Sequence, residues 1–153
     1  MSDGPVEIGL RRPMRSLGIA ASGLSAQRAR LDVIANNIAN AATTRGLDGT
    51  PYRRRVVQLE EVGFQPLLED NTAAAGEDGS GGVRVAGVVE DPSEGPLIYD
   101  PGHPDSDENG YVRMPNVSLT DEMVDMMQAR RLFDANVSVF QAIKSMLRRA
   151  TQL

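Results

Sequence analysis

The sequence predicts an α+β fold in which two long terminal α-helices form a coiled-coil-like pair and flank a small central antiparallel β or hairpin region. Apolar residues recur every seven positions near both ends, and the segment between them changes to short β-type runs separated by turns. A seven-residue period keeps one stripe of a helix facing a partner helix. The expected organisation is a flexible leader over 1–13, an N-terminal helix over 14–42, a central β and loop region over 43–117 and a C-terminal helix over 118–153.

The N-terminal helix is predicted from an apolar stripe that follows Pro13, because proline suits the first turn of a helix. Small residues inside this helix permit close backbone approach, but each of its two glycines costs about 1 kcal/mol relative to alanine. The helix is therefore expected to need a partner. The stripe consists of Leu17, Ala20, Leu24, Leu31, Ile34 and Ile38, and the small residues are Gly18, Ala20, Ala21, Gly23 and Ala26.

Three asparagines, Asn36, Asn37 and Asn40, stand in the last turns of this helix. Asparagine is a poor helix former, so the cluster requires a reason. One interpretation is a frayed helix end that leads into a turn. The other is amide hydrogen bonding between packed helices, which fixes their register as a buried asparagine does in a coiled coil.

The central region is expected to contain short strands over Arg54–Leu59, Val83–Val89 and Leu97–Tyr99. The Gly-rich stretch Ala75–Gly82 is the best candidate for a disordered loop. The basic run Arg53–Arg55 is interpreted as a solvated strand face, because acidic residues follow it closely.

The C-terminal helix is predicted from a second seven-residue stripe, and Ser118 and Thr120 offer N-caps before it. Asp121, Glu122 and Asp125 are assigned to the positive end of the helix dipole. The stripe consists of Leu119, Met126, Phe133, Phe140 and Leu147.

Composition and charge exclude several classes of function. The 153 residues include no Cys or Trp, three Phe and three Tyr, which is poor material for a large core and suggests a monomer whose stability depends on neighbours. The net charge of −5 combines +4 over residues 1–60, −13 over 61–125 and +4 over 126–153, and the acidic middle opposes nucleic-acid binding. We expect neither a membrane span nor a cleaved secretion signal.

The acidic stretch 105–111 matches the first half of a calcium loop, but its twelfth position is Asn116 instead of the required glutamate. Pro101, Pro104 and Pro115 also disfavour the flanking helices. The expected structure is an Asp/Asn-Gly turn that presents Tyr111 to a following extended segment. His103 is the only histidine and is assigned a structural loop role. The sequence therefore predicts no catalytic residue, no metal site and no cofactor.

Several motifs together resemble bacterial flagellar axial proteins, the family of rod and hook subunits. The N-terminal resemblance lies in Ser22-Gly23-Leu24, Asn36-Asn37-Ile38-Ala39-Asn40 and Thr43-Thr44. Further motifs resemble the rod members in particular: Asp100-Pro101-Gly102-His103-Pro104-Asp105, Gly110-Tyr111-Val112, Pro115-Asn116-Val117, Glu122-Met123-Val124-Asp125, Ala129-Arg130 and Ala135-Asn136-Val137. The resemblance covers residues 15–60 and 97–153, whereas residues 1–13 depart from it.

The resemblance implies a non-enzymatic structural subunit of the proximal rod in the flagellar basal body, on the periplasmic side. Such subunits are exported by the flagellar type III apparatus, polymerise through their terminal helices and are required for motility. The implied partners are copies of the chain, other rod proteins, ring or adaptor proteins at the rod base and the export apparatus, with no nucleic acid and no small-molecule substrate. The predicted subunit-packing residues are Leu17, Leu24, Leu31, Ile34, Asn37, Ile38, Asn40, Met126, Phe133, Asn136, Val137, Phe140, Ile143 and Leu147.

Two alternatives of other classes remain open on the sequence. One is a soluble coiled-coil adaptor that pairs its helices with one partner and does not polymerise. The other is a small calcium-dependent hydrolase built on His103 and the acidic loop.

Overall fold

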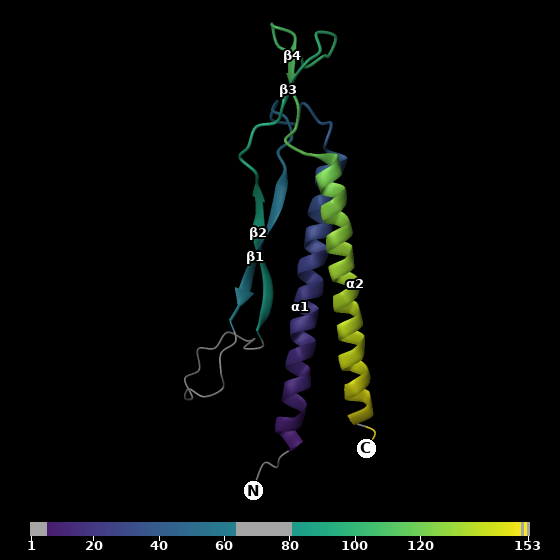
Figure 1. Cartoon of the computed structure of the whole chain (residues 1–153). Coiled ribbons are helices and arrows are strands. Elements are labelled where there is room, and N and C mark those ends of the chain that lie inside the picture. The colour runs from purple at the N-terminus through teal and green to yellow at the C-terminus, as the bar shows by residue number, and fades with distance from the viewer. Residues whose placement is uncertain (1–5, 64–80, 151, 153) are drawn as a thin grey trace, which may run out of the picture. The chain divides into compact units, whose positions relative to one another are not determined.

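The computed structural model describes residues 6–63, 81–150 and 152. In chain order, four short strands lie between two long helices (Figure 1). The fold is therefore α+β, as the sequence predicts. The elements are α1 (Val6–Ala39), β1 (Arg55–Val62), β2 (Gly82–Glu90), β3 (Leu97–Tyr99), β4 (Tyr111–Arg113) and α2 (Leu119–Ala150).

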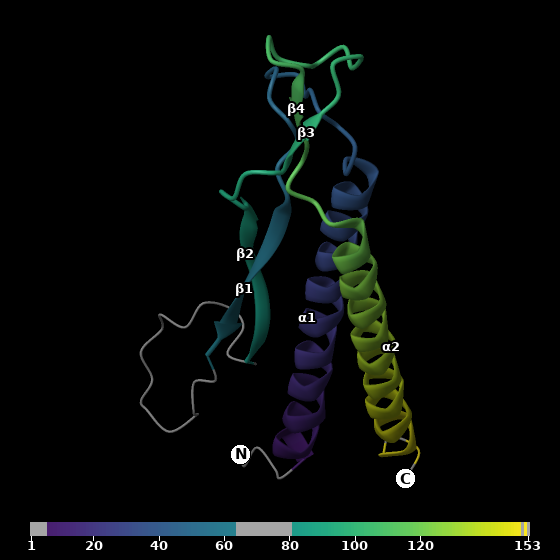
Figure 2. The ribbon, with the colours of Figure 1, turned by 45° about the horizontal axis from the view of Figure 1, so that its top comes forward.

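The chain divides into two compact units, and each long element contributes to both. Unit 1 comprises Met1–Arg28, Leu59–Ala86 and Arg131–Leu153, and unit 2 comprises Ala29–Gln58 and Gly87–Arg130. Within each unit, the segment of α1 lies beside the segment of α2, as the two views in Figures 1 and 2 agree. The sequence-predicted helix pair is therefore present inside one chain.

The helix ends differ from the expected boundaries. Helix α1 begins at Val6 and continues through Pro13, ahead of the predicted start at Met14. The short run before Pro13 contains good helix formers such as Glu7 and Leu10, and a proline disfavours the helical conformation of its predecessor without forbidding it. The flexible leader remains a prediction for residues 1–5, which lie outside the described residues. The same helix ends at Ala39 instead of Ala42.

The strands form two separate two-stranded sheets, β1–β2 and β3–β4. The backbone N–H of Asp91 donates to the carbonyl of Arg54 at 2.7 Å, which continues the first pairing beyond the end of β1. In the second sheet, Leu97 pairs with Arg113 and Tyr99 with Tyr111 in antiparallel register.

Two strands are longer than predicted, and a further strand was not predicted. Strands β1 and β2 reach Val62 and Glu90, slightly beyond the predicted ends. Strand β4 was expected only as an extended segment after the turn, because three residues are too short to show an alternating pattern. Most of the predicted disordered loop, residues 75–80, lies outside the described residues.

The apolar core is thin. Among the described residues, apart from Pro115, five apolar side chains are buried, and three of them are alanines. They are Ala20 and Ala26 in unit 1 and Ile34, Val112 and Ala129 in unit 2. Within the described part of the chain, neither helix is long and apolar enough to cross a membrane.

Candidate functional site

The fourteen predicted packing residues all lie on faces that the structure covers at least in part. Only Ile34 and Asn37 are buried, and the other twelve are half-buried. These fourteen residues are therefore covered, wholly or in part, by other parts of the same chain, whereas Leu119 of the C-terminal stripe is 46% exposed. Contact with other subunits remains a prediction.

In unit 1, the small-residue face of α1 permits a close approach to α2. A Cβ atom added to Gly23 would lie 3.0 Å from Nδ2 of Asn136, which is tighter than ordinary van der Waals contact. Ser22, the preceding residue, uses its Oγ to accept the backbone N–H of Val83 at 3.2 Å. The predicted close approach is thus confirmed at Gly23, and α1 also holds the start of β2.

In unit 2, the side chain of Asn37 is completely buried and forms four hydrogen bonds. Its Nδ2 donates to the carbonyl of Arg55 at 2.8 Å and to Oε2 of Glu122 at 3.1 Å. Its Oδ1 accepts from the hydroxyl of Tyr52 and from the backbone N–H of Arg55, both at 2.9 Å. An amide side chain has two donor hydrogens and an acceptor oxygen with two lone pairs, so Asn37 is fully satisfied.

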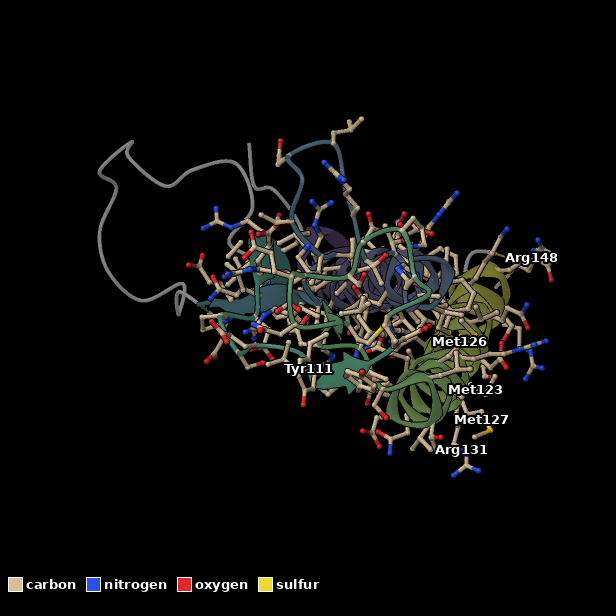
Figure 3. All side chains as sticks on the ribbon, turned by 90° about the horizontal axis from the view of Figure 1, so that it is seen from above. Tyr111, Met123, Met126, Met127, Arg131 and Arg148 are labelled. Carbon is tan, nitrogen blue, oxygen red and sulfur yellow. The ribbon has the colours of Figure 1, made fainter. Side chains whose placement is uncertain are left out.

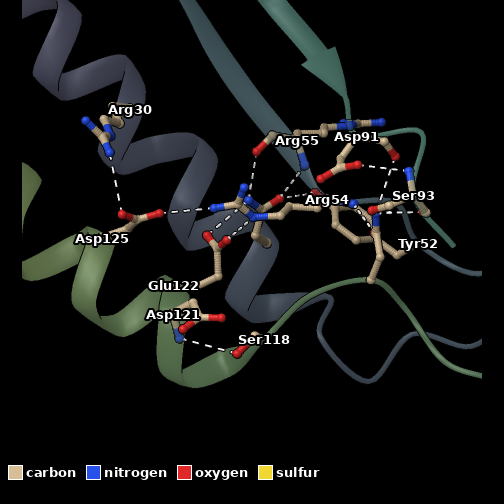
Figure 4. Close-up of polar contacts among 12 residues, drawn as sticks. Arg30, Tyr52, Arg54, Arg55, Asp91, Ser93, Ser118, Asp121, Glu122 and Asp125 are labelled. Atoms are coloured by element: carbon tan, nitrogen blue, oxygen red, sulfur yellow. Dashed lines mark hydrogen bonds and ion pairs between the residues drawn. The ribbon is translucent and has the colours of Figure 1, made fainter. Parts of the chain in front are cut away.

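An ion-pair network centred on the buried Glu122 adjoins Asn37 (Figure 4). Glu122 is completely buried, and its Oε1 accepts from Nε of Arg54 at 2.5 Å. The guanidinium of Arg54 also reaches Asp125 at 3.0 Å, and Asp125 in turn lies 3.5 Å from Arg30 of α1. The network therefore joins α1, the segment that enters β1 and the first turns of α2.

The hydrogen bond with Glu122 raises the pKa of Arg54 above its usual value, while burial acts in the opposite direction. The pKa of Tyr52 is also raised, chiefly by burial, and the positive charge of Arg55 partly offsets this effect. Both groups therefore keep their protons at neutral pH, which maintains the network.

Arg54 overturns the prediction that Arg53–Arg55 form a solvated strand face. Arg53 and Arg55 are exposed, but the side chain of Arg54 is only 28% exposed and lies between two carboxylates. The physical reason is that the backbone leading into β1 is extended, which sends neighbouring side chains to opposite faces. Similarly, Glu122 and Asp125 serve this ion pair in addition to lying near the helix start.

The asparagine cluster divides between its two interpretations. Asn37 forms the interhelical amide contact, whereas Asn36 and Asn40 donate to the carbonyls of Asp32 and Asn36, both at 2.8 Å. These bonds occupy carbonyls in the last turns of α1, as expected for residues that end a helix.

Asn116 fixes the segment that enters α2. Its Oδ1 accepts the backbone N–H of Arg54 at 2.6 Å, and its Nδ2 donates to the carbonyl of Ser93 at 2.9 Å. Ser118 then caps α2, because its Oγ accepts the N–H of Asp121 at 3.4 Å. The hydrogen bond from the Ser93 side chain also lowers the pKa of Asp91.

The acidic loop in unit 2 forms the expected turn. Asp107 Oδ1 accepts the backbone N–H groups of Asn109 and Tyr111 at 2.9 and 2.8 Å, and Gly110 has a φ of 80°. The described residues contain no group of three or more His, Asp or Glu side chains placed to hold a metal ion. Asp107 therefore has a local role in shaping the turn.

His103 and Asp105 form a second set of loop contacts. Nδ1 of His103 accepts the backbone N–H of Asp105 at 3.1 Å, and the carboxylate of Asp105 accepts from the hydroxyl of Thr44 at 2.7 Å. The hydrogen bond from Thr44 is the main reason that the pKa of Asp105 is lowered. The arrangement ties this loop to the segment that follows α1.

The chain matches two family models, and both place it among flagellar rod proteins. Residues 17–45 match the model described as "Flagella basal body rod protein". Residues 108–153 match the model described as "Flagellar basal body rod FlgEFG protein C-terminal". The matched segments contain most of α1 and all of α2.

Similar curated proteins identify which family of rod proteins the chain belongs to. The chain is 47% identical over 145 residues to "Flagellar basal-body rod protein FlgC" of Borreliella burgdorferi, covering 88% of this chain and 93% of the relative. The protein of the same name from Bacillus subtilis is 41% identical, with 90% and 95% covered, and that from Salmonella typhimurium is 45% identical, with 84% and 88% covered. The chain belongs to the FlgC family of flagellar basal-body rod proteins.

Proposed function

We propose that the chain is a structural, non-enzymatic subunit of the proximal rod in the flagellar basal body. It is exported through the flagellar type III apparatus and polymerises with copies of itself and with other rod proteins. The observation that carries the proposal is the identity of 40% or more to rod proteins over nearly the whole chain. Partners at the rod base and the requirement for motility follow from the same role.

The physical character of the chain supports this role. Its thin core leaves stability dependent on neighbours, and its long helices offer extended faces for contact. Contacts between different faces of successive subunits do not close on themselves and therefore build a helical filament. The fourteen packing residues are proposed to hold the helices in the form that assembles.

The proposal predicts that Leu31→Asp and Phe140→Asp abolish rod assembly and swimming. Each change places a charge on a half-buried face where α1 and α2 pack. The measurement is swimming in soft agar, with electron microscopy of isolated basal bodies, after the variant genes replace the native gene.

Gln141→Asp is the matched control, because Gln141 neighbours Phe140 and is exposed. Normal swimming by the Leu31 and Phe140 variants would refute the packing assignment. Normal swimming after complete removal of the gene would refute the function itself.

A further inference from the structure

Helix α2 carries a second apolar seam in unit 1, on a different face from the stripe that packs in its own chain. The spacing between successive members alternates between three and four residues, which is the pattern of a coiled-coil contact. All five members are exposed, and the three largest are 47%, 51% and 59% exposed. The second seam consists of Leu132, Ala135, Val139, Ala142 and Met146.

The alternating spacing indicates that the partner of the second seam is a helix. The inward stripe of the same segment, which includes Phe133, Phe140 and Leu147, is half-buried and accounts for the packing within the chain. Exposed apolar residues on a solvent-facing surface are usually scattered without a regular spacing, whereas the members of this seam follow a heptad repeat. The second seam is therefore suited to a helix from another chain.

An open groove adjoins the second seam at Val139. The groove has a volume of about 540 Å³ and is lined mainly by apolar side chains, including Ile19, Leu59 and Val139. Gln27 also lines it, and its buried Oε1 has no hydrogen-bond partner among the described residues. This buried oxygen costs free energy while it is unpaired.

The charges around the second seam oppose a like helix. The unit 1 segment of α2 carries four basic residues and one acidic residue, Asp134, and the adjacent segment of α1 from residue 15 to 28 carries two arginines and no acid. Arg131, directly before the seam, points away from its helix (Figure 3) and forms no ion pair with the described residues. The same helices of a second copy would bring like charges together, which disfavours pairing.

We propose that the second seam binds an amphipathic helix of a different protein, with apolar residues at heptad spacing and acidic residues on its flanks. This partner assignment rests on the proposed function, since it concerns how the subunit meets its neighbours in the rod. The apolar residues of the partner cover Leu132, Val139 and Met146, and its acidic residues face Arg131 and Arg149.

Binding is tested with the full chain and two fluorescent synthetic helical peptides of four heptads. Both peptides carry leucine at the apolar positions, and the flanking residues are glutamate in one and lysine in the other. Fluorescence anisotropy should show that the glutamate peptide binds at least tenfold more tightly than the lysine peptide. Val139→Asp should weaken its binding at least tenfold, and Gln141→Asp should leave it unchanged.

Far-UV circular dichroism should show equal helix content in the two variants, because both residues are exposed. Equal binding of the two peptides, or equal binding by the two variants, would overturn the proposal. Sedimentation that showed self-association of the chain, lost only in Val139→Asp, would assign the second seam to a second copy instead.

A test in cells separates this inference from the proposed function. Swimming should be lost with Val139→Asp and kept with Gln141→Asp. If removal of the gene stops swimming but Val139→Asp does not, the inference fails while the rod function stands. A photocrosslinking residue at position 139 should join a helix with acidic flanks in another protein, and a crosslink to this chain's own sequence would contradict the proposal.

Discussion

Asn37 links three parts of unit 2 through a single side chain. It contacts β1 through Arg55, the preceding segment through Tyr52 and α2 through Glu122. All four hydrogen bonds of a buried amide are used, so any shift of one element leaves a polar group unpaired. This arrangement gives unit 2 a specific register, which a core of small apolar residues would not supply.

The interhelical role of Asn37 was one of two interpretations that the sequence allowed, but the partners were not visible in it. Glu122 lies 68 positions from Arg54, and neither residue belongs to a spacing pattern that connects them. An acidic residue near a helix start is already explained by its interaction with the helix dipole, and this explanation still holds for the exposed Asp121. A buried ion pair between distant segments depends on the folded geometry, so it could not be predicted.

Replacement of Glu122 by alanine should lower the free energy of unfolding by about 3 kcal/mol, because it removes the completely buried one of the two carboxylates that pair with Arg54. Urea denaturation of the purified chain measures the change.

The control is Glu94→Ala, which removes the ion pair with Arg113 between largely exposed side chains. That change should cost less than about 1 kcal/mol. Equal losses in the two variants would show that the buried network does not stabilise the fold.

At the scale of the elements, the seven-residue stripes predicted the two helices correctly, and most stripe residues are covered within the chain, whereas Leu119 is 46% exposed. The stripe residues Leu31, Phe133 and Phe140 are all half-buried. Pro13 was assigned to the first turn of this helix, and α1 in the structure continues through Pro13 from Val6. Strand β4 is too short for periodicity to reveal, and its pairing with β3 depends on the intervening loop.

The β3–β4 sheet depends on a close backbone approach at Gly95. A Cβ atom at this position would lie 1.9 Å from the carbonyl oxygen of Met114, where no side chain fits. Gly95→Ala should therefore lower the free energy of unfolding by about 3 kcal/mol, measured by urea denaturation.

Gly87→Ala in β2 is the matched control, because no atom lies within 4 Å of the added Cβ. It should leave stability nearly unchanged. Similar stability of the two variants would mean that the chain relieves the contact at Gly95 by a small movement.

At the scale of the whole molecule, long helices are combined with few buried apolar side chains. The aromatic content of 4% predicted this thin core, and the structure agrees, since the largest fully buried side chains of the described residues are Glu122 and Asn37. Large apolar residues such as Met127 and Met146 are instead exposed, at 64% and 59%. Such a chain gains stability when neighbours cover those residues.

The purified monomer should therefore contain less helix than its 34-residue α1 and 32-residue α2 together provide. Far-UV circular dichroism measures the helix content, and addition of the assembling rod components should raise it. A monomer with full helix content would contradict this expectation.

The residues that bond to Asn37 lie at very different distances from it along the chain. Tyr52, Arg54 and Arg55 follow Asn37 within 18 positions, whereas Glu122 comes 85 positions after it. The first sixty residues therefore contain the hydrogen-bond donors of the cluster, and the carboxylate that accepts from them lies much later in the chain. Because synthesis begins at the N-terminus, the donors exist before their acceptor, and the network closes only once Glu122 has been made.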